Sequence, residues 1–286
     1  MEVKHIELTQ EKEEVFDLHV KDNHNFFTDC GLVHNCHEVA APKYREFLTY
    51  FKAAKVTGLT ATPEREDGMT PVLKAYIGPI VEIDDLGEMK TKVHLLKSKF
   101  FYHFIGKKDK YHELLRALIY NKSRNRLIVE ILKFYVEQEK KILCYSNRIR
   151  HMEILEKMAK ESIPGVRTAI LASTPYGKPM SIEEQEEVKN RAKNNEIDIL
   201  FGGKIVEQGF NCEPLSVATL ATPTKSARLI EQVLGRCQRE YPGKKEAILV
   251  DIIDEKTKVL KFQFFAKNRK LYKKYRKEHG IPVPLS

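Results

Sequence analysis

Short apolar segments alternate with amphipathic segments along residues 111–252, and this alternation limits the folds open to the chain. Apolar strands that are each followed by a helix favour a parallel sheet with helices on both faces, because parallel neighbours need crossover connections. The expected strands are 141–146, 166–171, 198–201, 217–221 and 247–252. The expected helices are 111–137, 148–160, 181–193, 203–208 and 225–238. The predicted fold class is therefore α/β, with ligands bound at the carboxyl ends of the strands.

Charge is distributed unevenly along the 286 residues, whose formal net charge is +9. Residues 1–35 hold three Lys against eight Asp and Glu, a net charge of −5, whereas residues 256–279 hold ten Lys and Arg against one Glu. Such blocks indicate segments with different partners, although a basic tail can also be a solvated helix face.

The tail at 256–286 is predicted to be a basic helix that packs on the second domain through its aromatic side chains. These are Phe262, Phe264, Phe265, Tyr272 and Tyr275. Contact of the tail lysines with phosphate is a second hypothesis. Those lysines are Lys270, Lys273, Lys274 and Lys277.

The chain shows neither a membrane segment nor a signal peptide. No apolar run approaches the roughly 20 residues of a membrane span, and the first residues lack the charged and then apolar layout of a signal peptide. The five cysteines are far apart, so neither a disulfide framework nor a zinc site is predicted. We therefore expect an intracellular protein without a membrane partner.

The segment VFDLHVKDNHNFFTDCGLVHNC at 15–36 resembles the two C-terminal blocks of inteins. The resemblance implies that Asn35 cleaves the chain by closing a succinimide ring on its own carbonyl, assisted by His34 and His24. It also implies that Cys36 is the nucleophile that receives the incoming acyl chain, with Asp17 tuning its thiol. An ordinary hairpin is the alternative. Strands are expected at 15–20 and 25–27.

Met1 lies 34 residues before Asn35, so the first blocks of an intein are not included in this stretch. We expect residues 1–35 to be a small β fragment of the Hint type that works in trans with a second chain. The net charge of −5 predicts a basic contact surface on that partner.

The residues after Cys36 resemble the C-terminal part of superfamily 2 helicases of the DEAD/DEAH-like kind, close to those of large DNA viruses and phages. Cys36 and His37 would complete the motif Asp-Glu-Cys-His if the partner ended in Asp-Glu. Thr60 and Thr62, in the run LTATPEREDG, match motif III, which couples the nucleotide site to nucleic acid. Residues 36–104 are expected to be the rear part of a first RecA-like domain, with a helix at 42–51 and a strand at 55–60.

Residues 105–255 resemble the second RecA-like domain of these helicases. KILCYSNRIRHMEIL at 141–155 matches motif IV and ILFGGKIVEQGFNCEPLS at 199–216 matches motif V. Motif V implies nucleotide contact at Gly209 and nucleic-acid contact at Lys204 and Asn211. Asn211 stands where Asp is frequent, which puts its contact in doubt.

Motif VI is matched by Gln232, Gly235, Arg236 and Arg239, in the pattern Q-x-x-G-R-x-x-R. Spacing by three places the two arginines on one helix face. By resemblance they reach the γ-phosphate as arginine fingers, with Gln232 and His37 also at the nucleotide.

The predicted function is that of a precursor, whose spliced product is the C-terminal part of an ATP-dependent helicase or translocase. No G-x-x-x-x-G-K-[ST] loop occurs in the sequence. ATP and Mg²⁺ are the expected cofactors, with the phosphate loop and the metal-binding carboxylates supplied by the partner half and no metal ligand in this chain. The nucleic acid is expected to be DNA rather than RNA, and the location a host cytoplasm or nucleus. The alternative is a non-enzymatic nucleic-acid-binding module with an inactive intein remnant.

Overall fold

The computed structural model describes residues 25–28, 31–35, 56–59, 68–79, 89–103, 110–207, 210 and 212–272. The chain divides into two units, Met1–Asp84 and Asp85–Ser286. No helix in the described ranges is long and apolar enough to cross a membrane.

The described part of the first unit contains a small sheet and one helix. β1 (Asn25–Thr28) pairs antiparallel with β2 (Gly31–Asn35), and β2 pairs in parallel with β3 (Val56–Leu59). Helix α2 (Thr70–Ile77) has a proline in its first turn, where a missing N–H costs nothing. The strands expected at 25–27 and 55–60 are confirmed, whereas α2 was not expected. The strand predicted at 15–20 and the helix predicted at 42–51 lie outside the described residues.

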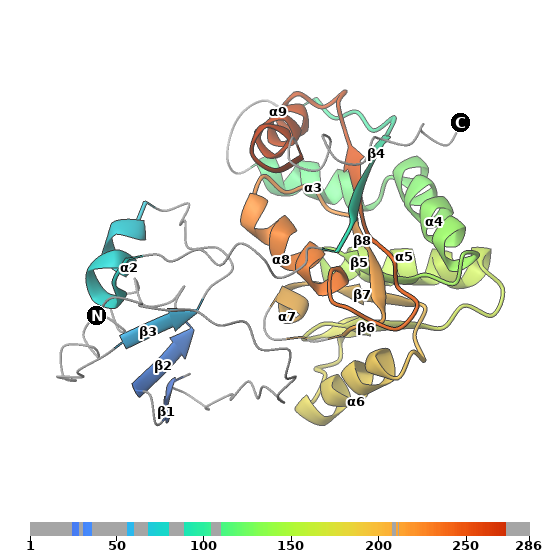
Figure 1. The fold of residues 1–286 in the computed structure, drawn as a ribbon. Coiled ribbons are helices and arrows are strands. Elements are labelled where there is room, and N and C mark those ends of the chain that lie inside the picture. The colour runs from blue at the N-terminus through green and yellow to red at the C-terminus, as the bar shows by residue number, and fades with distance from the viewer. Residues whose placement is uncertain are drawn as a thin grey trace. The chain divides into compact units, whose positions relative to one another are not determined.

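The second unit is built on a six-stranded sheet in the order β4-β9-β8-β5-β7-β6, with parallel pairing between all neighbours (Figure 1). The strands are β4 (Thr91–Lys97), β5 (Lys141–Tyr145), β6 (Thr168–Leu171), β7 (Ile199–Gly202), β8 (Leu215–Leu220) and β9 (Ala247–Ile253). The helices are α3 (Tyr111–Ile119), α4 (Lys122–Val136), α5 (Ile149–Ser162), α6 (Ile182–Lys193), α7 (Lys204–Glu207), α8 (Ala227–Cys237) and α9 (Lys258–Lys267). The predicted parallel α/β class is confirmed.

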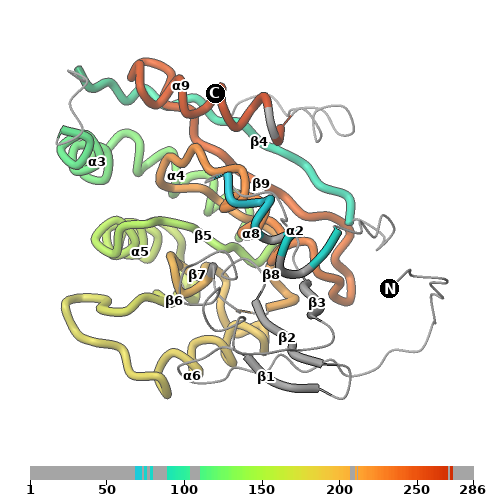
Figure 2. The backbone as a smooth tube through the Cα atoms, turned by 90° about the vertical axis from the view of Figure 1, so that its left-hand side faces the viewer, coloured from blue at the N-terminus to red at the C-terminus, as the bar shows by residue number. Residues whose placement is uncertain are grey.

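Helices cover both faces of this sheet because its central strands are apolar on both sides. Ile142 and Cys144 of β5 join one buried cluster with α4 and α5, whereas Leu143 and Tyr145 join another with α6, α7 and α8. Figure 1 shows α4 and α8 on opposite sides of the strands. A third cluster lies between α3 and α9, which occupy the same end of the unit in Figure 2.

Two sequence predictions are corrected within this unit. The helix expected at 111–137 is interrupted, because the Asn121 side chain accepts a hydrogen bond from the Arg124 backbone N–H at 2.9 Å and starts a new helix. β4, which was not predicted, pairs with β9 along its whole length. Residues 91–97 therefore belong to the second unit, and the boundary predicted at 104/105 lies too late in the chain.

The end of the described chain packs on the second unit through a buried polar group. The Lys267 ammonium lies 2.6 Å from the Asp251 carboxylate on β9, and the Tyr272 hydroxyl donates to the same carboxylate at 2.9 Å. Phe264 packs beside this group, as predicted. Phe262 and Phe265 are 63% and 44% exposed, so the prediction that the tail aromatics pack inward is wrong for these two. Tyr275 lies outside the described residues.

Candidate functional site

The carboxyl ends of β5, β7 and β8 are joined by hydrogen bonds at one edge of the sheet. The Ser146 N–H donates to the Gly202 carbonyl at 2.9 Å, and the Asn147 N–H donates to the Thr222 hydroxyl at 3.0 Å. These contacts align the segments predicted as motifs IV and V with the end of β8. In a parallel sheet this edge is where ligands bind.

Gly203 follows β7 where the backbone passes closest to β5. A Cβ atom added there would lie 2.8 Å from the Ser146 carbonyl oxygen and 2.8 Å from the Met152 methyl carbon. No side chain fits against a backbone oxygen at that distance, so glycine is required. The turn presents Lys204, the first residue of α7, with an exposed side chain.

The rest of motif V is anchored from both sides. Phe210 and Cys212 are buried, and the Lys244 ammonium donates to the carbonyls of Glu213 and Leu215 at 2.5 and 3.0 Å. Burial lowers the pKa of Lys244. Gly209 and Asn211 lie outside the described residues, so their predicted contacts stay predictions.

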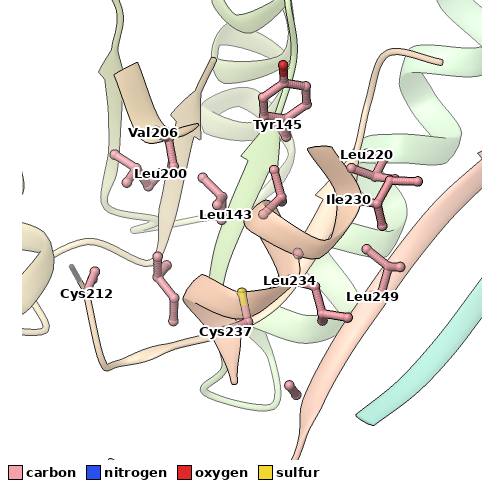
Figure 3. Close-up of a cluster of buried hydrophobic side chains, with 14 of the residues drawn as sticks. Leu143, Tyr145, Leu200, Val206, Cys212, Leu220, Ile230, Leu234, Cys237 and Leu249 are labelled. Carbon is pink, nitrogen blue, oxygen red and sulfur yellow. The ribbon is translucent and has the colours of Figure 1, made fainter. Parts of the chain in front are cut away.

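Helix α8 separates an apolar face from a cationic face. Figure 3 shows Ile230, Leu234 and Cys237 turned into the core near Leu143 and Leu249. The helix begins at Ser226, whose hydroxyl accepts from the Leu229 N–H at 3.3 Å. This cap and the buried face fix the rotation of α8 about its axis.

Two of the predicted motif VI residues, Gln232 and Arg236, lie on α8 away from its buried residues. Gln232 and Arg236 are one turn apart and half-buried, and Arg239 follows just after the helix, also half-buried. A Cβ atom at Gly235 would meet nothing within 4 Å, so the packing of this unit does not require glycine there. Gly235 therefore leaves open space directly before Arg236 on the helix.

Arg228 was not identified from the sequence, although it shares this face. It lies four residues before Gln232 and is half-buried. The four-residue spacing was a usable signal, but Arg228 falls outside the Q-x-x-G-R-x-x-R pattern. α8 therefore carries two arginines, Arg228 and Arg236, and Arg239 follows just after the helix.

A buried polar network supports the same sheet edge from the side of α4. The Arg124 guanidinium pairs with Asp254 at 2.9 Å and donates to the Ala221 carbonyl at 2.6 Å, and the Ser98 hydroxyl also donates to Asp254. Arg124 is 1% exposed. The ends of β4, β8 and β9 are thus tied to the first turn of α4.

The predicted splicing residues are described only in part. His34 and Asn35 end β2, where they lie opposite Gly58 and Leu59 of β3 in the parallel pair. Asp17, His24 and Cys36 lie outside the described residues, as do three predicted helicase residues. Those three are His37, Thr60 and Thr62.

Among the described residues there is no group of three or more His, Cys, Asp or Glu side chains that could hold a metal ion. The donors that the sheet edge and α8 present are guanidinium and ammonium groups. They fit the phosphates of a nucleotide and do not fit its metal ion.

Comparisons with known proteins agree with this geometry. Residues 123–240 match the family model of the helicase conserved C-terminal domain. The chain is 24% identical over 262 residues to a putative ATP-dependent RNA helicase, L396, of Acanthamoeba polyphaga mimivirus, covering 86% of this chain and 47% of that protein. It is 25% identical over 226 residues to the probable helicase D10 of Escherichia phage T5, covering 78% of this chain and 48% of that protein.

The fold is also found among solved structures. S. cerevisiae Dbp5 bound to RNA and ADP BeF3 superposes with a TM-score of 0.58 at 9% identity, covering 88% of this chain and 59% of that one. The chain thus spans about half the length of these proteins. Residues 123–240 are thus similar to the helicase conserved C-terminal domain, and the relatives over the longer stretch include viral and phage helicases.

Proposed function

We propose that this chain supplies the C-terminal part of an ATP-dependent nucleic-acid helicase or translocase. The observation that supports the proposal is that Gln232 and Arg236 lie one turn apart on α8, with open space at Gly235 between them in sequence and Arg239 just after the helix. Guanidinium groups held by a buried helix stabilise the charge of a phosphoryl group in transfer, because they need little reorganisation. A bound ATP–Mg²⁺ supplies the phosphoryl group and the metal charge.

The residues of the second unit have separate roles in this proposal. Arg236 and Arg239 hold the γ-phosphate, Gln232 orients it, and Gly209 lets the backbone approach the nucleotide. Lys204 and Asn211 contact the nucleic-acid strand, as do Thr60 and Thr62 of the first unit. The Asp-Glu pair and the phosphate loop come from the partner that is joined to Cys36 and His37.

The proposal includes a splicing reaction at residues 1–36. The Cys36 thiol attacks the ester or thioester carbonyl at the upstream splice junction and displaces the thiol or hydroxyl of the first residue of the partner's intein segment, which takes up the proton. Cys36 then holds the incoming chain as a thioester. The Asn35 side-chain nitrogen then attacks the Asn35 carbonyl carbon, which closes the succinimide and releases the Cys36 amine. That amine attacks the thioester, so that a peptide bond forms and the thiol is restored. His24 and His34 transfer the protons, and Asp17 acts on the thiol.

The ATPase proposal is tested on the spliced product with Arg236→Ala. We expect kcat for nucleic-acid-stimulated ATP hydrolysis to fall about a thousandfold, the usual loss for an arginine finger. Arg191→Ala, at an exposed arginine of α6 paired with Glu196, is the matched control. Unchanged hydrolysis by Arg236→Ala would remove the finger assignment and favour a non-enzymatic binding module.

The splicing proposal is tested by co-expression of the chain with the partner half. Asn35→Ala is expected to stop release of the product that begins at Cys36, because alanine cannot form the succinimide. Mass spectrometry of the products gives the readout, with Asn25→Ala in β1 as the control. Release of the same product from Asn35→Ala would end the splicing proposal.

A further inference from the structure

The outer face of α9 carries a stripe of alternating cationic and aromatic side chains. Lys258, Phe262 and Phe265 of α9, and Arg269 of the π-helical segment Asn268–Tyr272 that follows it, recur at steps of four, three and four residues, the spacing of one helix face. All four side chains are exposed. Lys261 flanks the stripe, with its ammonium 5.9 Å from the centre of the Phe265 ring. These five residues are called the α9 stripe below.

The inner face of α9 fixes this orientation. Leu260 is buried in the cluster with α3, and Lys267 pairs with Asp251 at 2.6 Å. The Gln263 amide donates to the Tyr111 hydroxyl on α3 at 3.1 Å, and Figures 1 and 2 both show α9 beside α3. The helix therefore cannot turn Phe262 and Phe265 inward without breaking a buried ion pair.

The charge around the stripe selects the chemistry of its partner. No acidic residue occurs between 256 and 272, and Glu255, the nearest acid before this range, lies 3.1 Å from Lys97. A second copy would bring like charges together, which opposes self-association. The suitable partner is an anion that also offers flat apolar faces.

We infer that the α9 stripe binds single-stranded nucleic acid outside the helicase motifs. Phe262 and Phe265, one turn apart, each offer a ring on which a base stacks. Lys258, Lys261 and Arg269 lie on either side of the rings and contact phosphates. The stripe lies beyond the matched region at 123–240. The inference rests on the proposed function and adds to it a strand-binding surface that needs neither ATP nor the partner half.

The test is fluorescence anisotropy of a labelled 20-nucleotide dT strand titrated with the full chain carrying Asn35→Ala, which prevents splicing. The double variant Phe262→Ser/Phe265→Ser is expected to weaken binding at least tenfold. The loss of a single base–aromatic stack raises the dissociation constant by about 5- to 150-fold. Phe134→Ser, at an aromatic residue of α4 that is 39% exposed, is the control and keeps the wild-type affinity. An rU strand of equal length shows whether DNA or RNA binds more tightly. Circular dichroism confirms that each variant is folded.

Two further arms separate stacking from charge. An abasic strand of the same length is expected to bind the wild type and the double Phe variant equally, because no base remains to stack. Lys258→Gln/Lys261→Gln is expected to reduce the slope of log K against log salt by about 1.4, since each single-strand phosphate contact contributes about 0.7. Lys157→Gln, at an exposed position of α5, is the control and leaves the slope of log K against log salt unchanged.

Several results would overturn the inference. They are wild-type affinity of the double Phe variant, no binding of either strand by the wild-type chain, and self-association in sedimentation that the Phe substitutions abolish. The last would make the stripe an interface between copies. If the α9 stripe does not bind nucleic acid, the outcome of the Arg236→Ala hydrolysis test is unaffected. If Arg236→Ala hydrolyses ATP like the wild type, the binding constants of the Phe262→Ser/Phe265→Ser variant still test the stripe.

Discussion

His151 lies in the first turn of α5, fully buried between two polar side chains. Its Nε2 lies 3.0 Å from the Asn125 amide oxygen and its Nδ1 lies 3.3 Å from the Ser146 hydroxyl. The Asn125 amide nitrogen donates to the Ile119 carbonyl at 2.8 Å, so its oxygen is the acceptor and the His151 Nε2 carries the proton. The ring is neutral at pH 7, because the pKa of His151 lies far below that value. Burial, with the nearby Arg124 charge, lowers the pKa of His151 from 6.5 to about 3.

This histidine makes the stability of the second unit sensitive to acid. His151 takes up a proton near pH 6.5 in the unfolded chain but only near pH 3 in the folded unit. The unfolded state therefore binds more protons between these values, and the free energy of unfolding decreases as the pH falls through this window. Between pH 7 and pH 5 the loss due to His151 is about 2 kcal/mol. His94, whose pKa burial lowers to about 4, adds a loss of the same sign.

Urea unfolding of wild type and His151→Gln at pH 7 and pH 5 isolates the His151 contribution. Glutamine keeps a donor for Asn125 and does not titrate, so the variant is expected to lose about 2 kcal/mol less than wild type over the same interval. His112→Gln, at an exposed histidine of α3 whose ring nitrogen lies 3.3 Å from the Arg148 guanidinium, is the control. An equal pH loss in wild type and His151→Gln would show that another group causes the acid sensitivity.

Single residues could be predicted from the sequence where a pattern and a helical period coincide. Arg236 lies on α8 away from the buried residues of that helix, whereas Arg239 follows the helix, so the shared face of the two arginines stays a prediction. Arg228 was missed because it precedes the pattern. The need for glycine at 203 depends on the Ser146 carbonyl, 57 residues earlier, and no local pattern contains that contact.

At the scale of elements, α9 is fixed to the sheet by the buried pair of Lys267 and Asp251. Lys267 is 2% exposed and Asp251 is 1% exposed, and one carboxylate oxygen of Asp251 has no hydrogen-bond partner in the described structure. Removing the ammonium leaves a buried carboxylate without its counter-charge, which costs about 3–5 kcal/mol.

Lys267→Met is therefore expected to lower the free energy of unfolding by several kcal/mol, about 3 or more. Lys261→Met, on the exposed side of the same helix, changes it by about 0.5 kcal/mol at most. Urea unfolding at pH 7 provides the measurement. Adding Asp251→Asn to Lys267→Met should restore part of the lost free energy of unfolding. If Lys267→Met loses no more than Lys261→Met, the ion pair contributes little to stability.

The elements themselves were predictable where burial dictates a continuous apolar run. β5, β7 and β9 are buried along nearly their whole length, and the sequence shows each as an apolar segment. β4 was missed because its only strand partner in the described sheet, β9, begins 150 residues after the end of β4. The interruption between α3 and α4 was missed because apolar residues continue at helical spacing on both sides of Asn121.

At the scale of the whole molecule, Asp85–Ser286 contains its own sheet and hydrophobic clusters. All six strands from β4 to β9 and all three buried clusters lie in this range. A domain with its own core folds independently. The fragment 85–286 is therefore expected to be soluble and to unfold in one cooperative transition. Circular dichroism against urea tests this, with the full chain as reference. A fragment that starts at residue 105, and so lacks β4, should be less stable, and equal stability of the two would contradict the assignment of β4 to this unit.

In the splicing proposal, the parallel pair of β2 and β3 has to separate. β2 ends at Asn35, and its neighbour β3 leads towards Thr60. If the chain is cut after Asn35 as proposed, the excised piece takes a strand of the first unit with it. The cut then also removes the backbone of Leu32–Asn35 from its hydrogen bonds with β3. Under the splicing proposal, release of the excised piece therefore requires the β2–β3 pair to open, and the hydrogen bonds of this pair oppose release.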